Sequence, residues 1–233
     1  MKRVACGVLA AFAGVASAEI ITLDLGAGSR HNPLPGATGA TGTGFASEYI
    51  RGGEFVISGL FSHDPFSSFC LELNETIAGG TSYIASVDTA AVKGGVGGPS
   101  PDPLSNETAA LYREFARGNL TADDGESLVN FHNALQDAFW FLEEELGEVD
   151  FSAATAEASS DVFGDLSDRT QGLINSVWGT TAPVGGVRVL NLVDATDGRT
   201  DRQSVLVLIP LPGAGGLALA GLLGVAAIRR RLF

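Results

Sequence analysis

Residues 126–146, with the sequence ESLVNFHNALQDAFWFLEEEL, decide the fold of this chain. They form its longest periodic segment, because large apolar side chains recur there at intervals of three and four residues. Such spacing places them on one face of an α-helix and predicts that this face is buried. Gly147 follows directly and predicts the C-terminal stop of the helix. The apolar face consists of Leu128, Phe131, Leu135, Phe139, Leu142 and Leu146.

Short runs of β-forming residues lie on both sides of this helix. Two further helices are predicted at Asn106–Arg117 and Asp168–Trp178, from apolar spacing and composition. The order of strands, helices and strands predicts an α+β fold, in which a helical insertion covers a β-sandwich or barrel-like body. The predicted strands are Ile20–Leu25, Glu54–Leu60, Phe69–Leu73, Tyr83–Val87, Val187–Val193 and Gln203–Ile209.

The N-terminal residues 1–18 have the composition of a secretory signal. Lys2 and Arg3 precede an apolar stretch of small residues, and Ala16-Ser17-Ala18 fits the small-x-small pattern of a cleavage site. We therefore expect signal peptidase to cleave after Ala18. The mature chain would then begin at Glu19 in an exported protein.

The C-terminal residues 205–233 have a tripartite organisation. Pro210-Leu211-Pro212 precedes an uncharged run of Gly, Ala, Leu and Val, and Arg229, Arg230 and Arg231 follow it. The apolar run predicts a transmembrane helix, and the arginines favour a cytoplasmic C-terminus. This tail resembles the PEP-CTERM sorting signals of Gram-negative bacteria, in the variant with a Val-Pro-Leu-Pro motif. Here Ile209 takes the first position. The resemblance implies anchoring in the inner membrane, processing by an exosortase-type membrane protease, and delivery to the cell surface or extracellular matrix.

Removal of both end segments leaves residues 19–204 as one strongly acidic domain. The end segments hold five of the fourteen basic residues and no acidic residue, so nine basic and twenty-seven acidic residues give the domain a net charge of −18. Nucleic acid is excluded as a partner, because phosphate binding requires clustered Lys and Arg side chains. A length near 190 residues is sufficient for one sizeable core.

The expected mature chain has a single cysteine, Cys70, because Cys6 lies within the signal segment. Exported proteins normally use cysteines in disulfide pairs. A lone exported thiol is therefore buried and inert, bonded to another chain, or used in chemistry. The segment Leu135-Gln136-Asp137-Ala138-Phe139-Trp140 favours chemistry, because Gln136 supplies a side-chain carboxamide that a thiol can attack.

These two segments together resemble the thioester domains of bacterial surface adhesins. That family has an aromatic-Cys-aliphatic segment, which Phe69-Cys70-Leu71 matches here. It also has a later apolar-Gln-x-Ala-apolar-Trp segment, which the six residues from Leu135 to Trp140 match. The resemblance implies an internal thioester between Cys70 and Gln136, on a β-rich domain with a helical subdomain. This chain has Leu135 where the family often has Thr, and Phe139 where Ile or Val is usual.

A thioester requires a thiolate held against a carboxamide in a site from which water is excluded. On a helix, His132 lies four residues before Gln136, whereas Phe139 and Trp140 lie three and four residues after it. We expect the two aromatic rings to form a dry wall. His132 is a candidate carrier of the proton of the thiol or of the departing amine. An amine on a target would then replace sulfur at Gln136, which consumes the bond, so the protein would not be an enzyme.

Three alternatives remain open at this stage. Cys70 can be an inert thiol in a structural matrix or biofilm protein of the same fold. Cys70, His132 and Asn133 are residue types of a cysteine peptidase, although no peptidase signature surrounds the cysteine. Asp194, Asp197 and Asp201 can bind calcium, but their spacing differs from that of a calcium loop and favours a solvated turn. No cofactor and no metal site are predicted.

Overall fold

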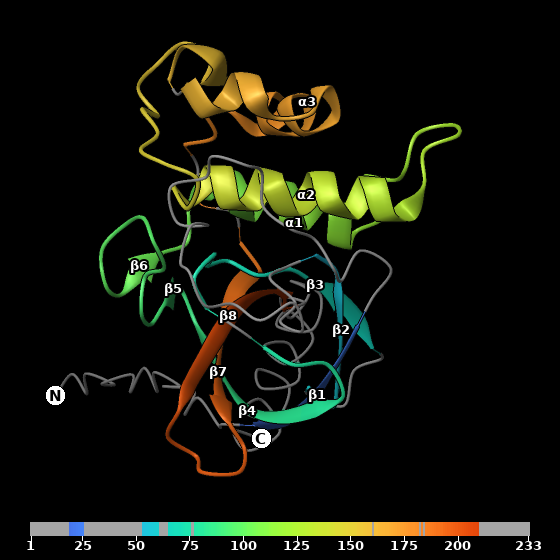
Figure 1. Cartoon of the computed structure of the whole chain (residues 1–233), viewed down its shortest axis with the longest axis vertical. Helices are drawn as coiled ribbons and strands as arrows, with labels where there is room; N and C mark the ends of the chain where they lie inside the picture. The colour runs from blue at the N-terminus through green and yellow to red at the C-terminus, as the bar shows by residue number, and fades with distance from the viewer. Residues whose placement is uncertain are drawn as a thin grey trace, which may run out of the picture.

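A computed structural model describes residues 19–25, 53–60, 65–75, 77–159, 161–181, 183 and 185–209. Its main sheet has six antiparallel strands in the order β3-β2-β1-β4-β7-β8, and a small second sheet pairs β5 with β6. The predicted α+β class is confirmed, and the main sheet is curled into a half-barrel (Figure 1). The strands are β1 Glu19–Leu25, β2 Phe55–Ser58, β3 Phe66–Ser68, β4 Thr81–Asp88, β5 Ala90–Ala91, β6 Asp102–Pro103, β7 Val187–Asp194 and β8 Asp201–Leu208.

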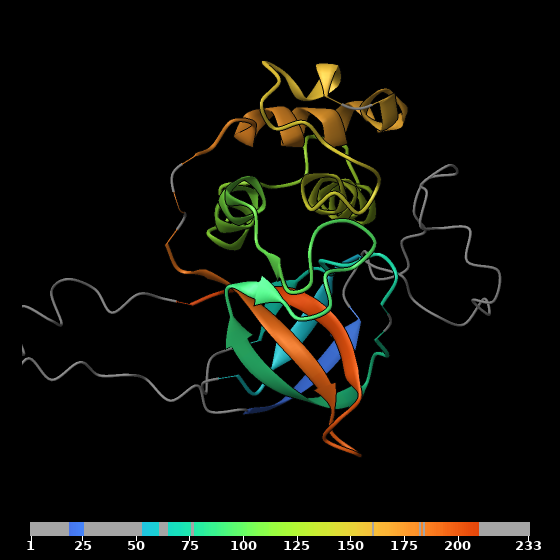
Figure 2. The ribbon, with the colours of Figure 1, turned by 90° about the vertical axis from the view of Figure 1, so that its left-hand side faces the viewer.

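The helices lie in two layers over one side of the half-barrel. In Figure 2, α1 and α2 are seen end-on next to the sheet, and α3 lies beyond them. All of these elements come between β4 and β7, which are neighbours in the sheet, so the helical part is an insertion, as the sequence predicted. The helices are α1 Asn106–Ala116, α2 Leu128–Leu142 and α3 Asp168–Val177, with short 3-10 turns η1 Ala156–Ala158 and η2 Asp161–Asp165.

Each of the three α-helices found in the described residues begins directly after a serine. The hydroxyl oxygens of Ser105, Ser127 and Ser167 accept the backbone N–H three residues ahead, at 3.1 Å in each case. This bond satisfies one of the N–H groups that a helix start leaves without an intrahelical partner.

Helix α2 ends four residues earlier than its apolar face predicts. Its last residue is Leu142, and Glu144 adopts a φ of 63°, which a helix cannot continue. Leu146 is nevertheless buried, with an exposed fraction of 1 %. The apolar periodicity therefore continues through a turn that is no longer helical, and the following glycine does not mark the helix end.

The predicted strand Phe69–Leu73 is also corrected. The regular strand β3 lies just before it, and within the segment only Cys70 makes an isolated bridge, to Val205 of β8. This bridge brings the edge of β3 toward the other edge of the sheet and curls it. The predicted strand Gln203–Ile209 is confirmed as β8, which ends at Leu208 and pairs with β7.

Two apolar clusters meet along β7 and β8. Val187, Val189 and Leu206 pack with the helices, whereas Leu190 and Val205 pack inside the curled sheet. Both strands are consequently buried on both faces.

Several sequence predictions fall outside the described residues. These are the signal segment 1–18, the apolar run of the tail, and the sorting-motif residues Pro210, Leu211, Pro212, Arg229, Arg230 and Arg231. Among the helices that the structure does describe, none combines the length and the apolar character needed to cross a bilayer.

Candidate functional site at the contact of Cys70 and Gln136

Cys70 lies beside β8 with its own peptide groups turned away from that strand. The flanking bonds run from Leu71 N to Ser204 O at 3.0 Å and from Leu206 N to Phe69 O at 3.2 Å. This is the geometry of a non-hydrogen-bonded antiparallel pair, in which Cys70 and Val205 exchange no bond. The N–H and C=O of Cys70 therefore need a partner on the opposite side.

Gln136 of α2 is that partner. Its Nε2 donates to Cys70 O at 2.9 Å, and its Oε1 accepts from Cys70 N at 3.1 Å. The same Oε1 accepts a second bond, from Gly53 N at 3.0 Å. The Gln136 side chain is fully buried. The two residues that the motif pairs are thus in direct contact, through the carboxamide of one and the backbone of the other.

The thiol of Cys70 is free and 1 % exposed. It packs with the cluster inside the curled sheet, whereas its neighbours Phe69 and Leu71 pack with the helices. Burial, followed by the charge of Glu72, raises the pKa of the thiol well above its ordinary value. At neutral pH the group is therefore a neutral thiol.

His132 lies one turn before Gln136 and contacts the carboxyl group of Glu54. The distance from Nδ1 to Oε2 is 2.9 Å, and both side chains are about nine-tenths buried. The imidazole ring packs against Phe69, Phe115 and Phe131, with centroids 5.4 to 6.0 Å apart. It consequently lies on the helix side of the extended segment around Cys70, whereas the thiol lies on the sheet side.

Polar contacts continue from Glu54 to α1. Ser67 Oγ donates to Glu54 Oε1 at 2.5 Å, and Tyr112 Oη donates to Ser67 O at 2.8 Å. A cavity of about 400 Å³ lies beside this series of polar contacts, and the residues that line it include Ser67, Tyr112 and Phe115. Glu54, Ser67 and Tyr112 were not predicted as site residues, because no local pattern connects them to Gln136.

The two aromatic residues after Gln136 are both fully buried. Phe139 packs on Phe69, next to Cys70, with ring centroids 5.1 Å apart, and on Tyr112 at 6.2 Å. Trp140 belongs to the helical cluster. Aromatic side chains thus exclude water on the helix side of the Cys70–Gln136 contact.

Buried carboxyl groups hold the glycine-rich loop Gly94-Gly95-Val96-Gly97-Gly98 near the C-terminal end of α2. Glu145 accepts from Leu73 N, Val96 N and Gly97 N at 2.6 to 3.0 Å. Glu72 accepts from Gly94 N and Ser204 N, and burial, followed by a hydrogen bond with Glu75, raises its pKa to about 9. The sequence signal for this arrangement was the run of three glutamates directly after α2.

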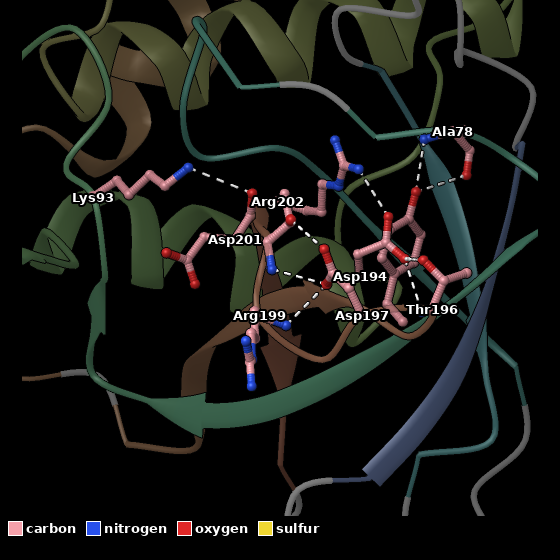
Figure 3. Close-up of polar contacts among 10 residues, drawn as sticks. Ala78, Lys93, Asp194, Thr196, Asp197, Arg199, Asp201 and Arg202 are labelled. Carbon is pink, nitrogen blue, oxygen red and sulfur yellow. Dashed lines mark hydrogen bonds and ion pairs between the residues drawn. The ribbon is translucent and has the colours of Figure 1, made fainter.

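The aspartates of the β7–β8 hairpin make contacts within the turn (Figure 3). Asp194 accepts from Thr196 N at 2.9 Å and from Arg202 Nη2 at 2.8 Å, and Asp197 accepts from Thr200 N at 2.9 Å. Within the described part of the chain, no group of three or more His, Cys, Asp or Glu residues is arranged to hold a metal ion.

Comparison with known proteins adds no relative: no family model, no curated protein and no solved structure matches this chain.

Proposed function

We propose that Cys70 and Gln136 form an internal thioester, through which this protein becomes covalently attached to an amine-bearing target. The observation that carries the proposal is the environment of Gln136 Oε1. Two backbone N–H groups, those of Gly53 and Cys70, point at this oxygen from 3.0 and 3.1 Å. Such a pair of donors is an oxyanion hole, which stabilises the negative charge that develops when a nucleophile attacks the carbonyl carbon.

The reaction can be written for the Cys70 thiol and the Gln136 carboxamide, which is hydrogen-bonded to the backbone of Cys70. Cys70 Sγ attacks Gln136 Cδ, and the electrons of the C=O bond move to Oε1. Collapse of this intermediate breaks the Cδ–Nε2 bond, and the departing nitrogen leaves as ammonia with the proton of the thiol. Cys70 O holds Nε2 before it leaves, at 2.9 Å. A target amine later attacks the same carbon, which yields an amide and returns a proton to the Cys70 thiol.

Burial supports the same proposal. Cys70 and Gln136 are 1 % and 0 % exposed, so water reaches a thioester at this place slowly. The burial that raises the pKa of the thiol also makes its attack slow, so we expect formation of the bond to be a slow step after folding.

The proposal extends to the location of the protein. The resemblance of the end segments to an export signal and an exosortase-type sorting signal favours a place at the cell surface or in the extracellular matrix. The strong negative charge of residues 19–204 suits a protein that stays soluble outside the cell. Amine-bearing partners at that location include the lysine side chains of proteins and the amino groups of polymers.

A second candidate function is a non-covalent structural component of the matrix, in which Cys70 is inert. One observation favours it: the Gln136 carboxamide satisfies the N–H and C=O of Cys70 as a neighbouring strand would. In this case the same contact serves only to attach α2 to the sheet.

Peptide mapping of the purified full chain distinguishes the two. Under the first proposal, peptides with Cys70 and Gln136 are joined and lack one ammonia. Methylamine separates them, leaving N-methylglutamine at position 136 and a free thiol. The Cys70→Ala variant serves as the control and should incorporate no methylamine. A freely alkylated Cys70 and an unmodified Gln136 in the untreated wild type would leave the structural function.

A further inference from the structure

The segment Gly53–Glu54 contacts α2 at two points that are one helical turn apart. Gly53 N donates to Gln136 Oε1 at 3.0 Å, and Glu54 Oε2 contacts His132 Nδ1 at 2.9 Å. The two anchoring residues on α2 are four positions apart and therefore lie on the same face of the helix. Consecutive residues of one segment thus bind consecutive turns of another.

Gly53 depends on this attachment. It precedes β2 without belonging to it, and its φ of 97° lies in the region that favours glycine. Its N–H is consequently not held by a strand ladder. The Cys70 N–H, the other donor to Gln136 Oε1, belongs to a residue that the flanking bonds to β8 already hold.

Glu54 and His132 are themselves fixed by their surroundings. Ser67 donates to the second carboxylate oxygen of Glu54, and three phenylalanine rings pack around the imidazole. Side chains with restrained rotamers can position a reactive group far better than mobile ones.

We propose that Glu54 and His132 are a positioning pair, which holds the Gly53 N–H on the carbonyl oxygen of Gln136 and so completes the oxyanion hole. This inference rests on the proposed thioester. It gives His132 a role other than that of proton carrier, because Nδ1 lies 2.9 Å from Glu54 Oε2 and the ring lies on the helix side of Cys70.

The test uses the full chain with Glu54→Ala, Glu54→Gln and, as a matched control, Glu143→Gln. Glu143 is also a buried carboxylate, but it follows the last residue of α2 and bonds Ser105. Two rates are measured: methylamine incorporation at position 136, and amide hydrogen exchange of Gly53 in protein labelled with ¹⁵N-glycine. Exchange of the Cys70 amide, followed in uniformly labelled protein, is the internal reference.

Glu54→Ala should slow methylamine incorporation by about 10- to 100-fold, somewhat less than the effect of removing one donor of an oxyanion hole outright. Exchange of the Gly53 amide should accelerate at least about 10-fold relative to that of Cys70, because its hydrogen bond opens more often. Glu54→Gln keeps polar contacts to His132 and Ser67, so its rates of methylamine incorporation and of Gly53 exchange should lie close to those of the wild type. Glu143→Gln should change neither rate.

If Glu54→Ala incorporates methylamine and exchanges the Gly53 amide as fast as the wild type does, the positioning pair is overturned and the thioester proposal stands. An absent thioester in the wild type would overturn the proposed function instead. In that case Gly53 exchange still decides the pair: acceleration in Glu54→Ala supports it, and unchanged exchange overturns it.

Discussion

The carboxylate of Glu145 accepts the backbone N–H of Val96 with both oxygens, at 2.8 and 3.0 Å. It also binds Leu73 N and Gly97 N, so a single side chain after α2 joins the glycine-rich loop to the segment that follows Cys70. At Gly97 the loop lies so close to Glu144 that a side chain is excluded, since an added Cβ there would lie 2.4 Å from the backbone oxygen of Glu144.

Gly97→Ala should therefore destabilise the protein. The backbone on both sides must move to admit the methyl group, at a cost of about 1–3 kcal/mol in the free energy of unfolding. Gly172→Ala in α3 is the matched control, because an added Cβ there meets nothing within 4 Å. It should stabilise by about 0.5–1 kcal/mol through helix propensity. Urea denaturation measures both, and equal effects of the two substitutions would contradict the close approach.

Stability should decrease as pH rises from about 4.5 to about 7. Burial raises the pKa of Glu143 to about 7, although hydrogen bonds from Ser105 and Thr108 oppose the shift. Below pH 4.5 the carboxyl is protonated in both the folded and the unfolded state. Between the two pKa values only the unfolded state loses the proton, which favours unfolding by up to about 3 kcal/mol. Denaturation of wild type and Glu143→Gln across this range should give a flatter curve for the variant, and parallel curves would refute the assignment.

Ser105→Ala should lower the free energy of unfolding more than Ser127→Ala does. Both hydroxyls cap a helix, and loss of a cap costs about 1 kcal/mol. Ser105 Oγ additionally donates to the buried Glu143 side chain at 2.6 Å, and its removal leaves Glu143 Oε1 with only the Ser105 N–H at 3.2 Å, which adds about 1 kcal/mol. The difference should disappear when both substitutions are made in a Glu143→Ala background, which removes the acceptor, and a double-mutant cycle of unfolding free energies tests this.

Gln136→Leu should be strongly destabilising whether or not a thioester forms. The substitution leaves Gly53 N, Cys70 N and Cys70 O without their partner, at about 1–3 kcal/mol for each buried group. Gln171→Leu provides the comparison, since that side chain is only partly buried and donates one bond, to Leu166 O at 2.8 Å. If thermal denaturation shows a similar decrease in stability for Gln136→Leu and Gln171→Leu, the Gln136 hydrogen bonds contribute little to stability.

Apolar spacing and β-forming runs were sufficient to predict the helices and most strands, because those patterns are local. The predicted end of α2 was wrong, since Leu146 stays on the buried face although Glu144 has already left the helical conformation. Burial periodicity reports which side chains face the core, and it does not by itself report the backbone conformation that carries them.

The candidate site was likewise predicted from the sequence only in part. The proximity of Cys70 and Gln136 followed from a two-part motif, and both residues lie in segments with a recognisable pattern. Gly53 and Glu54 reach α2 across 83 and 78 positions of sequence, from the start of a predicted strand whose pattern does not indicate contact with α2, so only the folded structure reveals the contact.

The position of the helical insertion also has a consequence for folding. Strands β4 and β7 pair side by side, with Asp88 opposite Val189, although about a hundred residues separate them. Such a pairing closes a long loop and forms slowly, whereas the helices and the β7–β8 hairpin need only short-range contacts. We therefore expect β7 to join β4 late, after the insertion has become compact. Until then the edge of β4 is open to pairing with another chain, which makes this step the one most sensitive to aggregation during folding.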